Sequence, residues 1–214
     1  MNAEHTPSQR RVCSVGSHLW FALLLLVGCG AGPRPAPAPA CDQTCQDGVA
    51  LRALRTAMKI AYNFEVSTKP VGAQDGTAPC VSFDGSRAGS VHVFGDARVN
   101  AVQGASIVSL TYDFKNCLYS APPDPTADQN YSLTLTGQVT ETGTISVQPT
   151  ATTALIIQTV VDPSTMQPTN SLSVSGTVYD PALNYSFSNC ALSVVQNGNA
   201  VSGALCGRSA GFTF

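Results

Sequence analysis

The chain has 214 residues, with 11 basic and 13 acidic side chains, a net charge of −2 and 43% hydrophobic residues. This length suits one domain plus a tether and is sufficient for a buried core. The sparse, nearly balanced charge includes no clustered basic patch, which excludes the electrostatic surface that nucleic-acid binding needs.

The N-terminal segment has the layout of a secretory signal peptide. Arg10 and Arg11 precede an apolar run from about Val12 to Val27. Polar residues interrupt this run, so it is short for a bilayer span. The next feature is Leu26-Val27-Gly28-Cys29, which resembles the lipobox of bacterial lipoproteins.

The resemblance to lipoproteins implies that residues 1–28 are removed and that Cys29 is lipidated as the new N-terminus. Acyl chains on Cys29 would hold the protein to a membrane without spanning it. In many Gram-negative bacteria an Asp after this cysteine favours retention in the inner membrane, so Gly30 favours the outer membrane. The expected location is therefore the cell envelope, lipid-anchored at the outer membrane.

Residues 29–42 are expected to be the lipidated cysteine and a tether rich in Pro and Ala. Alternating prolines between Gly30 and Ala40 favour an extended spacer of roughly 30 Å. Residues 43–214 then form a single predicted domain.

A helix is predicted over residues 43–62. Thr44 and Asp47 resemble a capping box at its start, and Leu51, Leu54, Met58 and Ala61 form one apolar stripe. A neighbouring basic stripe is interpreted as a solvated face, in preference to a contact with lipid headgroups; it consists of Arg52, Arg55 and Lys59.

From about residue 80 the apolar period changes to two, which predicts half-buried antiparallel strands. Residues 151–161 contain three consecutive apolar side chains and are compatible with a strand buried on both faces. The inward-facing positions of the clearest strands are Val108, Leu110, Tyr112 and Phe114; Leu133, Leu135, Gly137 and Val139; and Leu172, Val174, Gly176 and Val178.

Two pairs of segments resemble each other within the chain. Residues 110–117 match 183–190 at Leu, Tyr, Phe, Asn and Cys, and residues 132–139 resemble 171–178. Their offsets differ, which favours a single meandering sheet with repeated strand types over a duplicated unit.

Six cysteines remain once Cys13 and Cys29 are assigned to the signal and the lipid. An even number in an exported chain predicts three disulfides among Cys41, Cys45, Cys80, Cys117, Cys190 and Cys206. A three-residue loop at 197–199 would place Cys190 opposite Cys206. Cys41 and Cys45 lack the partners of a zinc site, so no metal and no cofactor are expected.

Candidates for catalysis are few. Gly207-Arg208-Ser209-Ala210-Gly211 matches the G-x-S-x-G pattern, but the Asp and His that follow a nucleophile elbow are missing. His92 should project from the less buried face of a strand, and the sequence does not identify a partner for general-base catalysis. Asp124 and Asp128 fit a polar hairpin loop better than a calcium site. We therefore expect no enzyme activity.

The predicted architecture is α+β, with one N-terminal helix on a large curved antiparallel sheet; the alternative is a β-sandwich. The element order resembles the half-barrel of periplasmic lipoprotein carriers and their outer-membrane receptor. Candidate ligand-facing residues, if the sheet curls without closing, are Leu51, Leu54, Met58, Tyr112, Phe114, Tyr185 and Phe187.

The predicted function is that of a non-catalytic envelope lipoprotein, either structural or binding an apolar ligand between helix and sheet. A surface adhesion or protein-interaction module is the alternative, and a hydrolase is the third class. The expected partners are the membrane, through the anchor, and an apolar ligand or an envelope protein.

Overall fold

A computed structural model describes residues 41–214, except 101, 103, 122–129, 149–150, 161–163, 165–168, 170 and 179–182. The described part contains one helix followed by ten strands of a single antiparallel sheet. Their bounds are α1 Gln43–Thr68, β1 Gly72–Val81, β2 Arg87–Asn100, β3 Ala105–Ser120, β4 Tyr131–Ser146, β5 Ala154–Thr159, β6 Leu172–Val178, β7 Leu183–Cys190, β8 Leu192–Asn197, β9 Ala200–Leu205 and β10 Arg208–Thr213.

The sheet divides into two branches at β4. The first half of β4 pairs with β6, which in turn pairs with β7. The second half of β4 pairs with β5, and from β5 the sheet continues through β8 and β9 to β10. Gly137, with a φ of 114°, lies at the division. A bulge in β3 between Phe114 and Cys117 lies opposite the same point. A bulge bends its strand and increases the local twist, which lets the two branches diverge.

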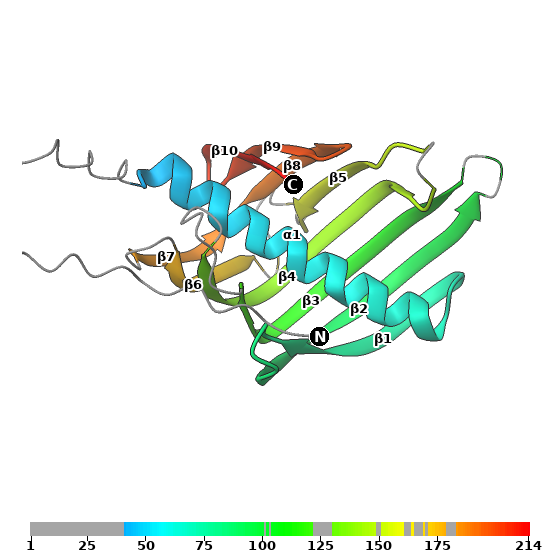
Figure 1. Ribbon diagram of the computed structural model, residues 1–214, viewed down its shortest axis with the longest axis horizontal. Coiled ribbons are helices and arrows are strands. Elements are labelled where there is room, and N and C mark those ends of the chain that lie inside the picture. The colour runs from blue at the N-terminus through cyan, green and yellow to red at the C-terminus, as the bar shows by residue number, and fades with distance from the viewer. Residues whose placement is uncertain are drawn as a thin grey trace, which may run out of the picture. The chain divides into compact units, whose positions relative to one another are not determined.

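Helix α1 crosses the inner face of the sheet diagonally (Figure 1). The helix residues that face the sheet are almost all apolar and fully buried, including Leu51, Leu54 and Met58. The strands bury alternate side chains against them, as the period of two predicted. The predicted fold is thus confirmed: α+β, with a large sheet that is not closed into a barrel.

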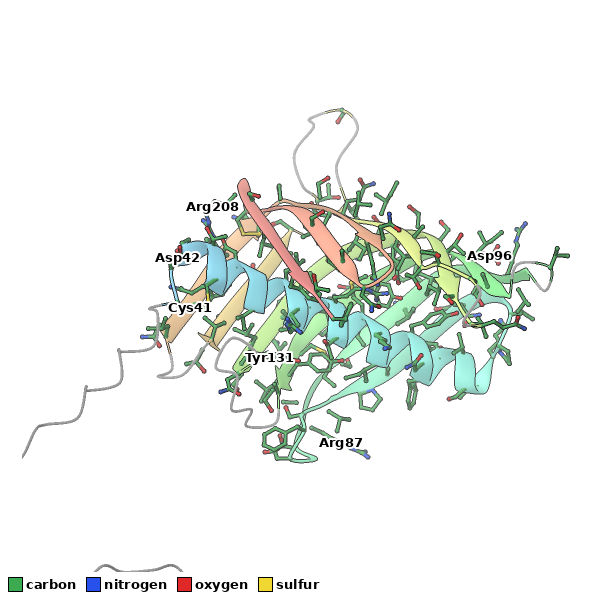
Figure 2. The ribbon with its side chains drawn as sticks, turned by 45° about the horizontal axis from the view of Figure 1, so that its top comes forward. Cys41, Asp42, Arg87, Asp96, Tyr131 and Arg208 are labelled. Carbon is green, nitrogen blue, oxygen red and sulfur yellow. A yellow bond between two sulfur atoms is a disulfide. The ribbon has the colours of Figure 1, made fainter. Side chains whose placement is uncertain are left out.

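Strand β10 runs alongside the helix on the side away from β1 (Figure 2). Arg52 Nη2 donates to the backbone oxygen of Thr213 at 3.1 Å. Gly48 is so close to β10 that a Cβ there would lie 3.0 Å from the oxygen of Gly211. The final strand therefore holds the helix from one side.

The helix differs from its prediction at both ends. Its N-cap is Asp42, whose side chain accepts from the backbone N–H of Cys45 at 2.9 Å, so the predicted capping box from Thr44 is wrong. The helix continues to Thr68 because Tyr62 and Glu65 are buried against the sheet. It ends before Pro70, which disfavours helical backbone at the preceding Lys69.

Two strand predictions are also corrected. Strand β5 is buried on one face only, since Leu155 and Ile157 are in the core while Ile156 is 50% exposed. The β8–β9 hairpin pairs Asn197 with Ala200, so its loop has two residues and its register is shifted by one from the prediction.

All six predicted cysteines form disulfides. Cys41 bonds Cys45 across the first turn of α1, Cys80 of β1 bonds Cys117 of β3, and Cys190 bonds Cys206. The last pair is correct despite the shifted register, because Cys206 lies in the turn after β9 with a φ of 51° and its N–H donates to the oxygen of Ala191.

Candidate ligand-binding cleft

A cleft with a volume of about 1010 Å³ opens between the C-terminal half of α1 and the inner face of the sheet. Its lining includes the start of β3, the end of β4 and residues 151–153 before β5. Figure 1 shows these strand ends extending beyond the helix. Its lining is mostly apolar. Its larger apolar side chains are Tyr62, Val66, Val99, Ile145, Val147 and Phe214, and its charged and polar side chains include Arg55, Lys59, Asn63, Ser106, Gln148 and Gln196.

The cleft runs across the strands, and polar side chains line both of its ends. At the β2–β3 end it is lined by Val66 and Pro70 on the helix side, by Val99 of β2, and by the polar side chains of Ser106 and Gln148. At the β8–β9 end it is lined by Arg55 and Gln196, together with Asn199 of the hairpin loop. The sheet order β2-β3-β4-β5-β8-β9 separates these two ends by two strands, β4 and β5.

Arg55 is held at the polar end by a buried network. Its Nε donates to Gln196 Oε1 at 2.7 Å, and its Nη2 lies 3.2 Å from Glu141 Oε1. Glu141 also accepts from the hydroxyl of Tyr112. Burial and the Glu141 carboxylate raise the pKa of Tyr112 well above its ordinary value, so the phenol keeps its proton.

The third nitrogen of the Arg55 guanidinium has no partner. Nη1 is buried and makes no hydrogen bond with the described part of the chain. Arg55 as a whole is only 5% exposed. A buried donor without an acceptor is costly to the folded state.

Lys59 lies one helical turn beyond Arg55 and also lines the cleft. Its Nζ lies 6.0 Å above the ring of Phe214. No carboxylate among the described side chains lies within ion-pair distance of it. The predicted solvated basic stripe holds for Lys59, which is exposed, but it is wrong for Arg55, which is buried, and Arg52 binds the backbone of β10.

The predicted ligand-facing residues are elsewhere. None of the seven lines the cleft, because the helix packs directly on the sheet where they lie. Five are at most 2% exposed: Leu51, Leu54, Met58, Tyr112 and Phe114. Tyr185 is buried, and Phe187 packs beneath the Arg208 guanidinium at 4.2 Å.

A second polar cluster joins the start of α1 to β10 and β7. Asp47 is fully buried and accepts from Arg208 Nε at 2.7 Å, from Arg208 Nη2 at 2.8 Å and from the Tyr185 hydroxyl at 2.8 Å. Gln43 adds a fourth hydrogen bond at 3.1 Å. These contacts saturate the carboxylate, so the cluster is a structural tie between the three elements.

The remaining catalytic candidates do not assemble. His92 lies on the outer face of β2, as predicted, and its Nε2 is 2.7 Å from Asp75 Oδ1. Asp75 is 80% exposed at its side chain, so the pair is solvated. Ser209 is on β10, opposite Ala204 and away from His92. In the described part of the chain, no three His, Cys, Asp or Glu side chains converge as a metal ion requires.

Several predicted features lie outside the described residues: the signal peptide, Cys29 and most of the tether, and the loop with Asp124 and Asp128. Within the described stretches, no helix combines the length and apolar composition that crossing a bilayer requires. Comparisons with known protein families, with curated proteins and with solved structures find no match to this chain.

Proposed function

We propose that this protein is an exported, lipid-anchored binding protein that holds a small apolar molecule in the cleft between α1 and the sheet. The observation that carries the proposal is the cleft itself. Its volume of about 1010 Å³ is at the upper end of the range typical of small-molecule sites, and the surface of its lining is mostly apolar, with polar side chains distributed along it.

Exposed side chains around the cleft support this role. Val99 is 56% exposed, Val147 is 67% exposed and Phe214 is 45% exposed, and all three line the cleft. Apolar surface left in water is unfavourable at about 25 cal/mol per Å². A bound apolar molecule would remove this surface from water and gain the corresponding free energy.

The anchor is proposed from the sequence. Leu26-Val27-Gly28-Cys29 resembles a lipobox, and the Pro-rich tether after it separates the anchor from the domain. We therefore propose that the binding domain works in the cell envelope at a membrane surface. Catalysis is not part of the proposal, because His92 and Asp75 form a solvated pair on the outer face.

A second candidate is a protein-interaction module. Ile156 of β5 and Val195 of β8 are register partners on the outer face, and each is about half exposed. Adjacent exposed apolar residues can mark a docking surface. This pair is smaller than the apolar lining of the cleft, so we prefer the binding protein.

The test uses the full chain expressed in a bacterium and extracted in lipid nanodiscs. The probe is a photoreactive medium-chain alcohol, and peptide mass spectrometry identifies the labelled residues. We expect labelling of α1 and β4 peptides that line the cleft. Ile145→Trp fills the cleft and should reduce this labelling by about tenfold, whereas the matched variant Ile156→Trp on the outer face should not.

The same sample tests the anchor. The N-terminal peptide should begin at Cys29 and carry an acyl mass. An unmodified N-terminus at another residue would remove the anchor from the proposal. Cleft labelling that is unaffected by Ile145→Trp would remove the binding site.

A further inference from the structure

We propose that two copies of this chain form a dimer through the outer face of the sheet, over β4, β5, β8 and β9. The inference does not depend on the proposed function, because the cleft lies on the inner face of the sheet. Three observations carry it: a row of side chains that has the same chemistry read in either direction, the absence of charge around this row, and the area of the face.

A row of exposed side chains crosses the four strands on the outer face. At its centre, Ile156 of β5 is the register partner of Val195 of β8, and these side chains are 50% and 52% exposed. Thr142 of β4 is the register partner of Ile156 on one side. Ser202 of β9 is the register partner of Val195 on the other side. The row therefore has two branched apolar side chains at its centre and an exposed hydroxyl at each end.

The order of side chains makes this row complementary to itself. In an isologous dimer a two-fold axis places the same patch on both sides of the interface. If the axis runs along the strands, Ile156 of one copy faces Val195 of the other, and the two hydroxyl residues face each other. If the axis runs across the strands, each residue faces its own counterpart. In both arrangements apolar side chains meet at the centre, and hydroxyl groups, which both donate and accept, meet at the ends.

The rows on either side of the central row contain no charged side chain. They consist of hydroxyl, amide and alanine residues of the same four strands. On β2 and β3, by contrast, the outer face carries the ion pairs Asp96–Arg98 and Asp113–Lys115. A charged partner would find no counter-charge in the uncharged rows, whereas a second copy meets no like-charge repulsion there. An apolar centre with a polar rim is also the usual composition of protein interfaces.

The area of this face sets the expected strength of the dimer. Four neighbouring strands span about 19 Å, and the three rows extend about 17 Å along the strands. Two such faces bury about 1,000 Å² in total once the relief of the side chains is counted, which is the lower limit for a specific interface. We therefore expect a reversible dimer with a Kd of about 10 μM.

The experiment measures association of the full-length protein in detergent micelles by sedimentation, over a range of about 1 to 100 μM that brackets the expected Kd. Ile156→Lys and Ile156→Glu, each alone, place like charges close together across the interface and should weaken association by at least about tenfold. An equal mixture of the two variants should associate again, because opposite charges then meet. The matched control is Thr77→Lys, an exposed position on the outer face of β1, and it should associate like the unchanged chain.

Photo-crosslinking in bacterial membranes identifies what occupies the face. A benzophenone amino acid in place of Val195 should give a covalent product of twice the chain mass, whereas the same group in place of Thr77 should not. A product of a different mass from position 195 would show that another protein occupies this face, and would overturn the proposal.

The mixture of variants separates a lost interface from a lost fold, because a variant that fails to fold would not associate with the other. A chain that stays monomeric over the whole concentration range would overturn the dimer. Association that survives both substitutions of Ile156 would show that the copies meet through another face. The same conclusion would follow if both variants fold, remain monomeric alone and fail to associate in the mixture.

Discussion

Asp47 and Glu65 are both buried carboxylates on α1, and their surroundings shift their pKa values in opposite directions. Burial opposes ionisation of Asp47, but hydrogen bonds from Arg208, Tyr185 and Gln43 outweigh it and lower its pKa. Burial raises the pKa of Glu65. The electrostatic interaction with His92 partly offsets this rise, and the interaction with Asp75 adds to it. The Glu65 carboxylate lies directly against the backbone of Gly76, where a Cβ would be 2.1 Å from Oε2.

Glu65 should therefore make the folded protein less stable as the pH rises. Its raised pKa means that the folded chain binds the Glu65 proton more tightly than the unfolded chain, so stability falls between the unfolded pKa near 4.5 and the higher folded pKa. Glu65→Gln removes this effect and should raise the Tm by a few degrees at pH 7 but by little at pH 4. Thermal unfolding at both values measures it.

The matched variant is Asp96→Asn, which removes an exposed carboxylate that pairs with Arg98. Its effect should be small at both pH values. A Glu65→Gln variant that is destabilised at pH 7 would show that the ionised carboxylate makes a favourable contact, contrary to this prediction.

Some buried polar residues stand at positions that the sequence pattern already marks as inward-facing. Glu141 continues the inward-facing series of β4 two residues after Val139, and Gln196 follows Leu192 and Val194 in the same way. Asp47 is in phase with the apolar stripe of α1. A polar residue at an inward position requires a partner in the core. The partners themselves come from distant elements, so the sequence pattern alone does not identify them.

The internal resemblance of β3 and β7 has a structural meaning at the level of the element. In both strands the same bulge precedes the cysteine, and Asn116 and Asn189 adopt positive φ values of 50° and 55° there. Asn tolerates this backbone better than most residues. The equivalent tyrosines, Tyr112 and Tyr185, both donate to a buried carboxylate that also contacts an arginine.

Element boundaries were less predictable than element types. The alternation of residues 108–114 and 133–139 predicted the correct buried face because one face of each strand packs on α1. The last turns of the helix and the β8–β9 register depend on contacts with other elements, which override local preference. Three consecutive apolar residues in β5 were ambiguous, since period alone does not show which face is covered.

The Asp47–Arg208 contact should be a major tie between α1 and β10. Arg208→Gln leaves a fully buried carboxylate with only Tyr185 and Gln43, and should cost about 2 kcal/mol. This is less than for a fully buried pair, because the Arg208 side chain is 37% exposed. Because the pKa of Asp47 is lowered, the stability from this contact is present above its unfolded pKa and is lost as the pH falls through the folded value.

Urea unfolding at pH 7 and at acid pH measures this loss. The control is Arg98→Gln, which breaks the exposed pair with Asp96 and should cost less than about 0.5 kcal/mol. Equal costs for the two variants at pH 7 would show that the cluster around Asp47 contributes no more than a surface ion pair.

At the scale of the described domain, the cleft results from how the helix crosses the sheet. The N-terminal half of α1 is enclosed between the sheet and β10, and its apolar residues fill that space completely. The strands continue past the C-terminal half, where Arg55, Lys59 and Tyr62 border the open space. The direction in which the helix crosses the sheet depends on how the two branches diverge. The residue pattern of each single element therefore predicted a concave face of the sheet, but it did not predict that the helix leaves one end of this face open.

The three disulfides bridge chain segments of different length, and this sets the order of their contributions to stability. A disulfide stabilises mainly by restricting the unfolded chain, and the effect grows with the length of the closed loop. The bonded residues are separated by 37 positions for Cys80–Cys117, by 16 for Cys190–Cys206 and by 4 for Cys41–Cys45. Replacing each pair by alanine should cost about 4, 3 and 2 kcal/mol respectively.

The structure reinforces this order. Cys80, Cys117 and Cys190 are at most 1% exposed, so their loss also removes packing, and Cys190–Cys206 joins the β6–β7 branch to the β8–β10 branch. Cys41–Cys45 only closes the first turn of α1, where Asp42 still caps the helix. Urea unfolding of the three double variants measures the costs. A largest cost for Cys41–Cys45 would mean that the start of the helix, rather than the union of the two branches, controls unfolding.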